Sequence, residues 1–312
     1  MAKRLFALLL AILCLSSCGI TSTGEIIPPS SAEAGDFNHA ETTGAESEKT
    51  ATEQAEAEAT APAVTEETTE TVLMDSDGIK ITAKSLDKSG WMGPELKLLI
   101  ENNTAQNLTV QARSVSVNGY MVGSSLSADV AAGKKANDEL TLTASDLEIS
   151  GIETIADIEF SFHIFDSDSW DAYKDTDLVS VKTAAFGAYT QPVDDSGTIV
   201  YDDGGIKVVA KGLDTSGWMG PAVILYIQND SDTNITVQAR DESVNGFMID
   251  ASLSEEILPG KRSIADMSFL SSQIEENGIT DITEVEFVLH IFDTDTWDGI
   301  ADSAPIKLAF GE

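Results

Sequence analysis

The residues best suited to chemistry in this sequence form a nine-residue motif that occurs twice. It reads HIFDSDSWD at 163–171 and HIFDTDTWD at 290–298. A histidine beside carboxylates can bind a metal or act as a general base, because imidazole titrates near neutral pH. No serine, cysteine or second histidine joins His163 or His290 at a recognisable catalytic spacing. We therefore predict no catalytic residue, and we expect the protein not to be an enzyme.

The aspartates of the motif offer oxygen ligands at D-x-D-x-x-D spacing. Calcium takes about six to eight oxygens, which a loop of this kind can supply from carboxylates and backbone carbonyls. The pattern departs from the helix-loop-helix calcium signature, because a tryptophan replaces its third ligand and its final glutamate is missing. A plain acidic turn at the end of a strand is the alternative. Calcium is the one candidate cofactor, and its candidate ligands are Asp166, Asp168, Asp171, Asp293, Asp295 and Asp298.

All four tryptophans lie in two kinds of loop, one of which is the end of this motif. The other is a Gly-Trp-Met-Gly-Pro segment, which the flanking glycines and proline make a turn. Its large side chains either fold back to close the end of a sandwich, which is the favoured interpretation, or project outward. Exposed aromatic rings beside polar groups are typical of protein and glycan recognition. The candidate ligand-binding residues are Trp91, Met92, Trp170, Trp218, Met219 and Trp297.

The elements that position these loops belong to a duplicated domain. GIKITAKSLDKSGWMGP (78–94) matches GIKVVAKGLDTSGWMGP (205–221), and the register holds without a gap from there to the two motifs (163 and 290), at numbers that differ by 127. About half of the aligned positions are identical, which indicates an internal repeat. The motif was therefore copied with its whole domain, and its recurrence alone does not argue for a site.

Within each copy, apolar residues alternate with polar ones as they do in half-buried strands. Ile158, Phe160, Phe162 and Ile164 show this period of two. The Asn118-Gly119 pair between two apolar runs predicts a tight hairpin, and residues 145–148 fit one helical turn with a capping box. Long helical patterns are missing from the sequence, so parallel βαβ folds are disfavoured.

We predict an all-β fold with two tandem antiparallel β-sandwich domains of immunoglobulin-like kind, after a signal peptide and a disordered acidic linker. The linker is rich in Ala, Glu and Thr and has too few large apolar residues to form a core. The predicted boundaries are 1–17 for the signal peptide, 18–71 for the tether, 72–187 for repeat 1, 188–198 for a short linker and 199–312 for repeat 2.

The N-terminus, MAKRLFALLLAILCLSSC, carries two basic residues and then an apolar run that is too short to span a bilayer. The Leu-Ser-Ser-Cys sequence after that run resembles a bacterial lipobox, which implies lipidation of Cys18; an ordinary secretory peptide is the alternative. Cys14 and Cys18 are the only cysteines of the chain, so the domains after them have no thiol for a disulfide or a thiolate nucleophile. We expect two cores that are stable without cross-links.

The chain is strongly acidic, with 53 Asp and Glu residues, 18 Lys and Arg residues and a formal net charge of −35. A surface of this charge repels phosphate backbones, so nucleic acid is excluded as a partner. It favours cations, basic proteins or neutral glycans as partners, or it serves solubility alone.

The lipobox, the acidic tether and the repeats with SGWMGP, VQARxxSVNG and HIFDxDxWD resemble uncharacterised lipoproteins of Gram-positive gut bacteria. The resemblance implies immunoglobulin-like modules on the outer face of the cell membrane, held there by the N-terminal lipid, and it implies no activity. We predict a non-catalytic binding or adhesion module for a surface protein or a glycan. The alternative is a calcium-stabilised structural or sensory spacer, and a hydrolase is the third and least favoured hypothesis.

Overall fold

The computed structural model describes residues 66–217 and 220–311. The predictions for the signal peptide, for lipidated Cys18 and for most of the tether lie outside the described residues, as do the candidate residues Trp218 and Met219. Within the described ranges, no helix is both long and apolar enough to cross a membrane.

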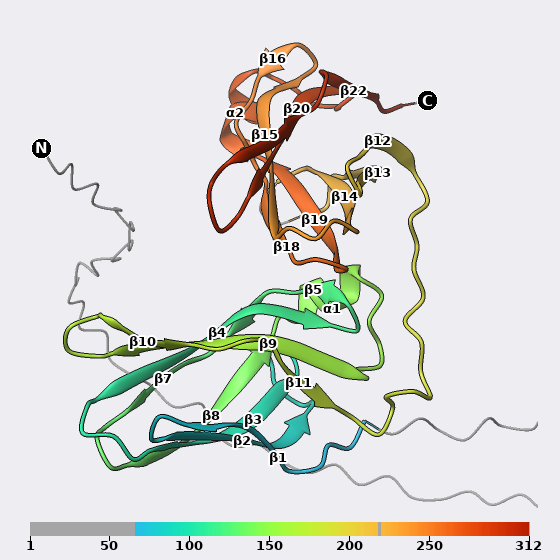
Figure 1. The fold of residues 1–312 in the computed structure, drawn as a ribbon. Helices are drawn as coiled ribbons and strands as arrows, with labels where there is room; N and C mark the ends of the chain where they lie inside the picture. The colour runs from blue at the N-terminus through green and yellow to red at the C-terminus, as the bar shows by residue number, and fades with distance from the viewer. Residues whose placement is uncertain (1–65, 218–219, 312) are drawn as a thin grey trace, which may run out of the picture. The chain divides into compact units, whose positions relative to one another are not determined.

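The first repeat consists of two layers of antiparallel strands (Figure 1). One layer has the strand order β1-β2-β3-β8-β6, and its strands are β1 (Thr71–Ser76), β2 (Ile79–Asp87), β3 (Glu95–Asn102), β8 (Lys135–Leu142) and β6 (Ser124–Ser125). The other has β9 and β4 at its centre, beside β10, β5, β7 and β11. These strands are β9 (Asp157–Asp166), β4 (Leu108–Val117), β10 (Ala172–Asp175), β5 (Tyr120–Met121), β7 (Ser127–Val130) and β11 (Val179–Lys182).

The second repeat has the same order of strands. The counterpart of the first layer is β12-β13-β14-β19-β17, with β12 (Thr198–Asp203), β13 (Ile206–Asp214), β14 (Ala222–Asn229), β19 (Arg262–Phe269) and β17 (Ala251–Ser252). The counterpart of the second layer has β20 and β15 at its centre. Its strands are β20 (Glu284–Asp293), β15 (Ile235–Val244), β21 (Gly299–Asp302), β16 (Phe247–Met248), β18 (Ser254–Ile257) and β22 (Ile306–Ala309). The predicted all-β sandwich fold is confirmed.

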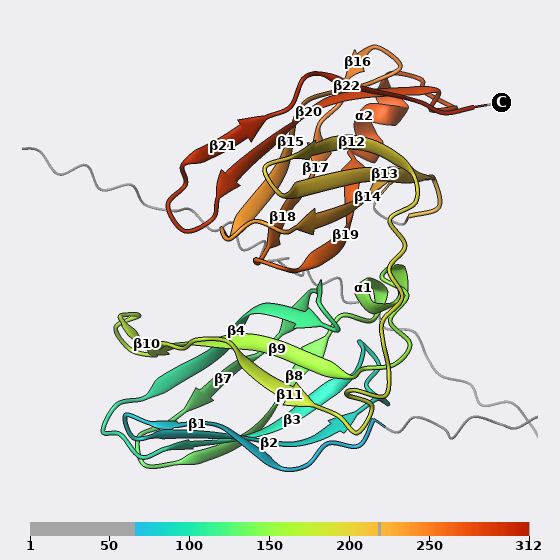
Figure 2. The same cartoon turned by 45° about the vertical axis from the view of Figure 1, so that its right-hand side comes forward.

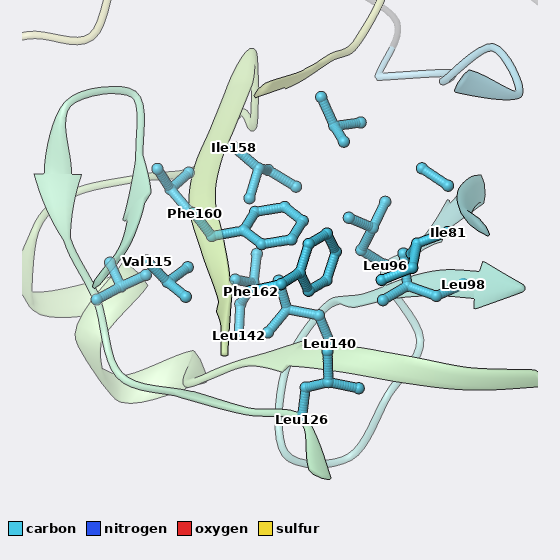
Figure 3. Close-up of a cluster of buried hydrophobic side chains, with 14 of the residues drawn as sticks. Ile81, Leu96, Leu98, Val115, Leu126, Leu140, Leu142, Ile158, Phe160 and Phe162 are labelled. Carbon is cyan, nitrogen blue, oxygen red and sulfur yellow. The ribbon is translucent and has the colours of Figure 1, made fainter. Parts of the chain in front are cut away.

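The alternation that predicted the strands also fills the core. In β9, Ile158, Phe160, Phe162 and Ile164 are buried and face the other layer, while their neighbours of opposite parity face away from it. Figure 3 shows Phe160 and Phe162 packed among leucines and isoleucines of both layers. Their rings meet edge to face, with centroids 5.2 Å apart and an interplanar angle of 87°. This geometry is favourable for aromatic pairs, and full burial of each ring contributes about 1.5–3 kcal/mol.

The predicted Asn-Gly hairpin joins β4 to β5. Asn118 and Gly119 have φ angles of 51° and 85°, as a two-residue turn of this type requires. The predicted helical turn is also present, as α1 (Ala144–Ile149), but its predicted capping box is wrong. The helix begins after Thr143, whose side chain makes no capping bond, and the Asp146 carboxylate instead accepts a hydrogen bond from the Gly123 N–H at 2.7 Å. The second repeat has a corresponding helix, α2 (Ser271–Glu276).

Candidate functional site

The duplicated motif forms the end of β9 and the hairpin that leads to β10. The Asp166 N–H donates to the Asp171 carbonyl at 2.9 Å, and the Trp170 N–H donates to the Asp166 carbonyl at 2.8 Å. These bonds close the loop with Trp170 in the left-handed region, at a φ of 65°. The hairpin of the second repeat has the same two bonds, and Trp297 has the same φ of 65°.

Three rings of the first motif lie in a row on the face of β9 that points away from the core. Phe165 is at the centre, with ring centroids 5.4 Å from those of His163 and Trp170, and it is stacked on the Trp170 ring at an interplanar angle of 18°. Phe165 is only 6% exposed because its two neighbours cover it, whereas Trp170 is 75% exposed. One face of the tryptophan is therefore held by phenylalanine and the other is open to solvent.

The second repeat reproduces this row of rings. Phe292 lies 5.4 Å from His290 and 5.5 Å from Trp297, with interplanar angles of 30° and 17°. Trp297 is 76% exposed. We call each row an aromatic stack: residues 163, 165 and 170 in the first repeat, and residues 290, 292 and 297 in the second.

A carboxylate orients the histidine, which lies at the end of each stack opposite the tryptophan. The Nδ1 atom of His163 lies 2.6 Å from Oδ1 of Asp175, and Nδ1 of His290 lies 2.6 Å from Oδ1 of Asp302. Both aspartates lie on the strand next to the histidine's own, at cross-strand positions. The bond orients the imidazole, and the ring then packs against phenylalanine.

The candidate calcium ligands of the first repeat accept hydrogen bonds within the hairpin and from the neighbouring loop. Oδ1 of Asp166 accepts from the N–H groups of Asp168 and Ser169, each at 2.9 Å, and Oδ2 accepts from Gln106 Nε2 at 2.9 Å. The backbone N–H groups of Ser169 and Asp168 hold the pKa of Asp166 below its usual value. Asp168 accepts from Asn107 Nδ2 at 3.2 Å. In the described ranges, no three or more His, Cys, Asp or Glu residues are grouped so that they could hold a metal ion.

Calcium binding by these aspartates stays a prediction. If the hairpins bind calcium, adding millimolar calcium to the full chain is expected to raise the melting temperature, because a ligand that binds only the folded state stabilises it. The Asp168→Asn and Asp295→Asn variants should then lose the increase. An identical melting curve in calcium and in chelator would contradict the prediction.

The Gly-Trp-Met-Gly-Pro turn of the first repeat connects β2 to β3. The Gly93 N–H donates to the Gly90 carbonyl at 3.2 Å, and the Ala144 N–H donates to the Met92 carbonyl at 3.0 Å. The backbone of the turn is thus bound to the start of α1, while Trp91 is 91% exposed and Met92 is 55% exposed. The expectation that Trp91 closes the end of the sandwich is wrong, because α1 covers this end of the core with the buried side chain of Leu147.

The two tryptophan loops of the first repeat lie at opposite ends of the sandwich. Trp91 neighbours the start of α1, whereas the hairpin that carries Trp170 contacts Gln106 and Asn107 of the β3–β4 loop. Figure 2 shows α1 and the β10 hairpin at the two ends of this repeat. Trp91 and Trp170 therefore cannot stack on each other, and each offers a separate exposed surface.

Sequence reasoning missed two parts of this site. Phe165 was not recognised as the centre of a stack, although its position beside Ile164 places an aromatic ring on the face opposite the core. A buried asparagine that shapes the adjoining loop was also missed: Asn102 at the end of β3, with Asn229 as its counterpart in β14. Both signals were present in the strand pattern, as a large ring or a polar side chain on the unexpected face.

No protein-family model matches the chain, and no curated protein matches it. Among solved structures, the chain is similar to the YadV chaperone, at 13% sequence identity and a TM-score of 0.24, over 74% of this chain and 100% of that one. It is also similar to a protein of unknown function from Porphyromonas gingivalis W83, at 10% identity and a TM-score of 0.19, over 77% of this chain and 96% of that one. TM-scores this low carry no argument about function.

Proposed function

We propose that the protein is a non-catalytic binding module whose contact surfaces are its exposed tryptophans. The observation that carries the proposal is the aromatic stack, in which Trp170 and Trp297 are held by a phenylalanine on one face and are about three-quarters exposed. A ring that is already immobile loses little conformational entropy when it contacts a partner. Tryptophan is also among the residues that contribute most to binding energy at interfaces.

The backbone conformation of the two tryptophans supports this proposal. Both occupy the left-handed region, which costs a residue with a side chain about 1–2 kcal/mol and which glycine adopts freely. Stacking on phenylalanine returns about 0.5–1.5 kcal/mol beyond the burial of apolar area, so the strain and the stacking oppose each other. A glycine would make this turn without strain but would not cover the phenylalanine. A tryptophan held in a strained conformation with its outer face exposed supports a contact between that face and a partner.

The net charge of the chain disfavours one class of partner, the polyanions. With a formal net charge of −35, the chain repels polyanions at low and moderate salt. A neutral glycan or a surface protein remains as the candidate partner. The flat face of an indole suits both, since sugar rings and aliphatic side chains stack on it. The proposed location is the outer face of the cell membrane, with the lipid on Cys18 as the anchor.

Substitution of both stacked tryptophans by glycine separates a binding role from a structural one. We expect the Trp170→Gly/Trp297→Gly variant to stay folded and to melt only a few degrees lower, because relief of backbone strain offsets part of the lost contact with phenylalanine. We expect its affinity for the partner to fall by at least about 30-fold, as for a tryptophan at the centre of an interface. Binding is measured on immobilised cell-wall polysaccharide and on purified surface proteins of the producing cell.

The matched control is Phe247→Ala, which removes a different exposed ring from β16 and should leave binding unchanged. Protection of tryptophan fluorescence from acrylamide by the retained partner gives a second measurement. The proposal fails if the double variant binds as well as the unchanged protein, or if it melts far below it, since the rings would then be structural.

A further inference from the structure

The outer face of the second layer carries two polar side chains beside each aromatic stack. In the first repeat, β4 and β9 lie side by side (Figure 2), and Gln111 of β4 is the cross-strand partner of His163 in β9. Residues opposite each other on antiparallel strands project from the same face, and so does Arg113, two residues further along β4. The second repeat has the same pair in β15 beside β20. We call each pair a polar row: Gln111 and Arg113 in the first repeat, and Gln238 and Arg240 in the second.

The arginine of each polar row has no partner within the described part of the chain. Arg113 and Arg240 are exposed, and in residues 66–217 and 220–311 neither guanidinium forms an ion pair, a hydrogen bond or a ring contact. Most lysines of this acidic chain do pair with a carboxylate, as Lys307 does with Glu284 at 2.7 Å. Two equivalent arginines therefore keep their N–H donors for a group from outside, although the chain has a net charge of −35.

The glutamine of each polar row donates to a serine on the next strand. Gln111 Nε2 donates to Ser127 Oγ at 3.4 Å, and Gln238 Nε2 donates to Ser254 Oγ at 3.2 Å. No donor within the described residues reaches the amide oxygen of either glutamine, so this oxygen is free to accept a hydrogen bond. In strand order, a planar acceptor thus lies between the stacked tryptophan and the arginine.

Both repeats retain the polar row although its neighbours have changed. Ser114 follows Arg113 in the chain and Ser161 lies opposite it, and these two serines correspond to Asp241 and Val288 in the second repeat. An exposed arginine without an internal partner has no packing and no hydrogen bond to preserve. Its presence in both repeats is therefore better explained by contact with a ligand.

On the basis of the proposed function, we propose that each polar row and its aromatic stack together bind an oligosaccharide that carries a carboxylate. A sugar ring packs on the open face of the indole, and a hydroxyl group donates to the glutamine oxygen. The guanidinium donates two parallel hydrogen bonds to the carboxylate. Ser161, opposite Arg113, is four residues from Phe165 on β9, which is about 13 Å along the strand. The ligand is therefore longer than one sugar ring.

The chemistry of this face favours a saccharide over a protein. A protein interface has an apolar centre, whereas the polar and charged side chains of the polar row lie beside the exposed indole. A polymer of dense negative charge is also disfavoured, because the rest of the chain repels it. The carboxylates of the ligand are therefore sparse, with neutral sugars between them, and each one lies against an arginine.

Calorimetry on the full chain tests the proposal with three probes of equal length: a trisaccharide that ends in glucuronate, its methyl ester, and the neutral trisaccharide that ends in glucose. We expect the acid to bind at least about 10-fold more tightly than the ester, as charge-assisted hydrogen bonds predict. In the Arg113→Gln/Arg240→Gln variant, the acid should bind no more tightly than the ester. The affinity for the neutral probe and the melting temperature should stay unchanged, because neither guanidinium has a partner in the described residues.

The matched control is Lys80→Gln/Lys207→Gln, which removes two charges at equivalent positions of β2 and β13, on the outer face of the first layer. It should keep the preference for the acid. Equal binding of acid and ester by the unchanged protein, no binding of any probe, or a preference for the acid that survives in the arginine variant would overturn the proposal.

The Trp170→Gly/Trp297→Gly variant separates these failures from a failure of the proposed function. If that variant loses its partner while the unchanged protein binds acid and ester alike, only the carboxylate ligand is wrong. If that variant keeps full affinity for its partner, the proposed function fails and the saccharide ligand fails with it.

Discussion

Replacement of Asn102 by alanine is expected to destabilise the first repeat by about 3 kcal/mol. Asn102 is 1% exposed, and its Nδ2 atom donates to the carbonyls of Gln106 and Val130, each at 2.8 Å. Its Oδ1 atom accepts from the Thr104 N–H at 2.9 Å and from the Thr104 hydroxyl at 2.7 Å. Alanine removes all four bonds at once and leaves the Val130 carbonyl, whose bond is buried, without its side-chain donor.

The expected loss is measured by urea denaturation of the full chain, followed by circular dichroism. Asn107→Ala is the control, since Asn107 is exposed and bonds Asp168 Oδ2 at 3.2 Å and the Ala132 N–H at 3.1 Å; it should cost less than about 1 kcal/mol. Asn229→Ala should match Asn102→Ala, because Asn229 bonds Thr233 and Ile257 in the same way. A loss for Asn102→Ala no greater than for Asn107→Ala would show that the side chain does not organise this loop.

The loop that Asn102 shapes explains why parts of the fold could be predicted from the sequence and parts could not. The strands β9 and β20 and the Asn118-Gly119 turn follow from local patterns, a period of two and a pair of residues that adopt positive φ. Asn102 lies in a polar Asn-Asn-Thr run that reads as an ordinary turn. The period of two along β3 nevertheless places Asn102 on the buried face of the strand. Its hydrogen bond to Val130, which is distant in the chain, has no signal in a local pattern.

The candidate site was likewise predictable from the sequence only in part. The aspartates were visible as oxygen donors at regular spacing, but the sequence could not show that Asp166 uses its oxygens on the hairpin backbone and on Gln106. The exposure of Trp91 was also misjudged. Large apolar residues tend to be buried, yet much of any protein surface is apolar. Trp91 stays exposed because α1 already covers this end of the core with Leu147.

Gly93→Ala is expected to destabilise the first repeat by about 3 kcal/mol and to displace the Trp91–Met92 turn. Gly93 has a φ of 141°, and a Cβ atom there would lie 1.9 Å from the Leu142 carbonyl oxygen and 2.9 Å from the Ala144 nitrogen. The carbonyl cannot easily move away, because Leu142 is fully buried at the end of β8 and its own N–H donates to the Pro94 carbonyl at 2.8 Å. The turn must therefore shift, which breaks the bond between Ala144 and Met92.

The control for this variant is Gly133→Ala, at a φ of 67° with no atom within 4 Å of the added Cβ. It should cost only the left-handed strain, about 1 kcal/mol, because nothing has to move. Gly220→Ala in the second repeat should fall between the two, since its Cβ would meet the Phe269 carbonyl oxygen at 2.7 Å. Melting temperatures of the three variants rank the costs, and acrylamide quenching reports the change around Trp91. If Gly93→Ala melts together with Gly133→Ala, the turn is not held against β8, and the exposed position of Trp91 loses its physical basis.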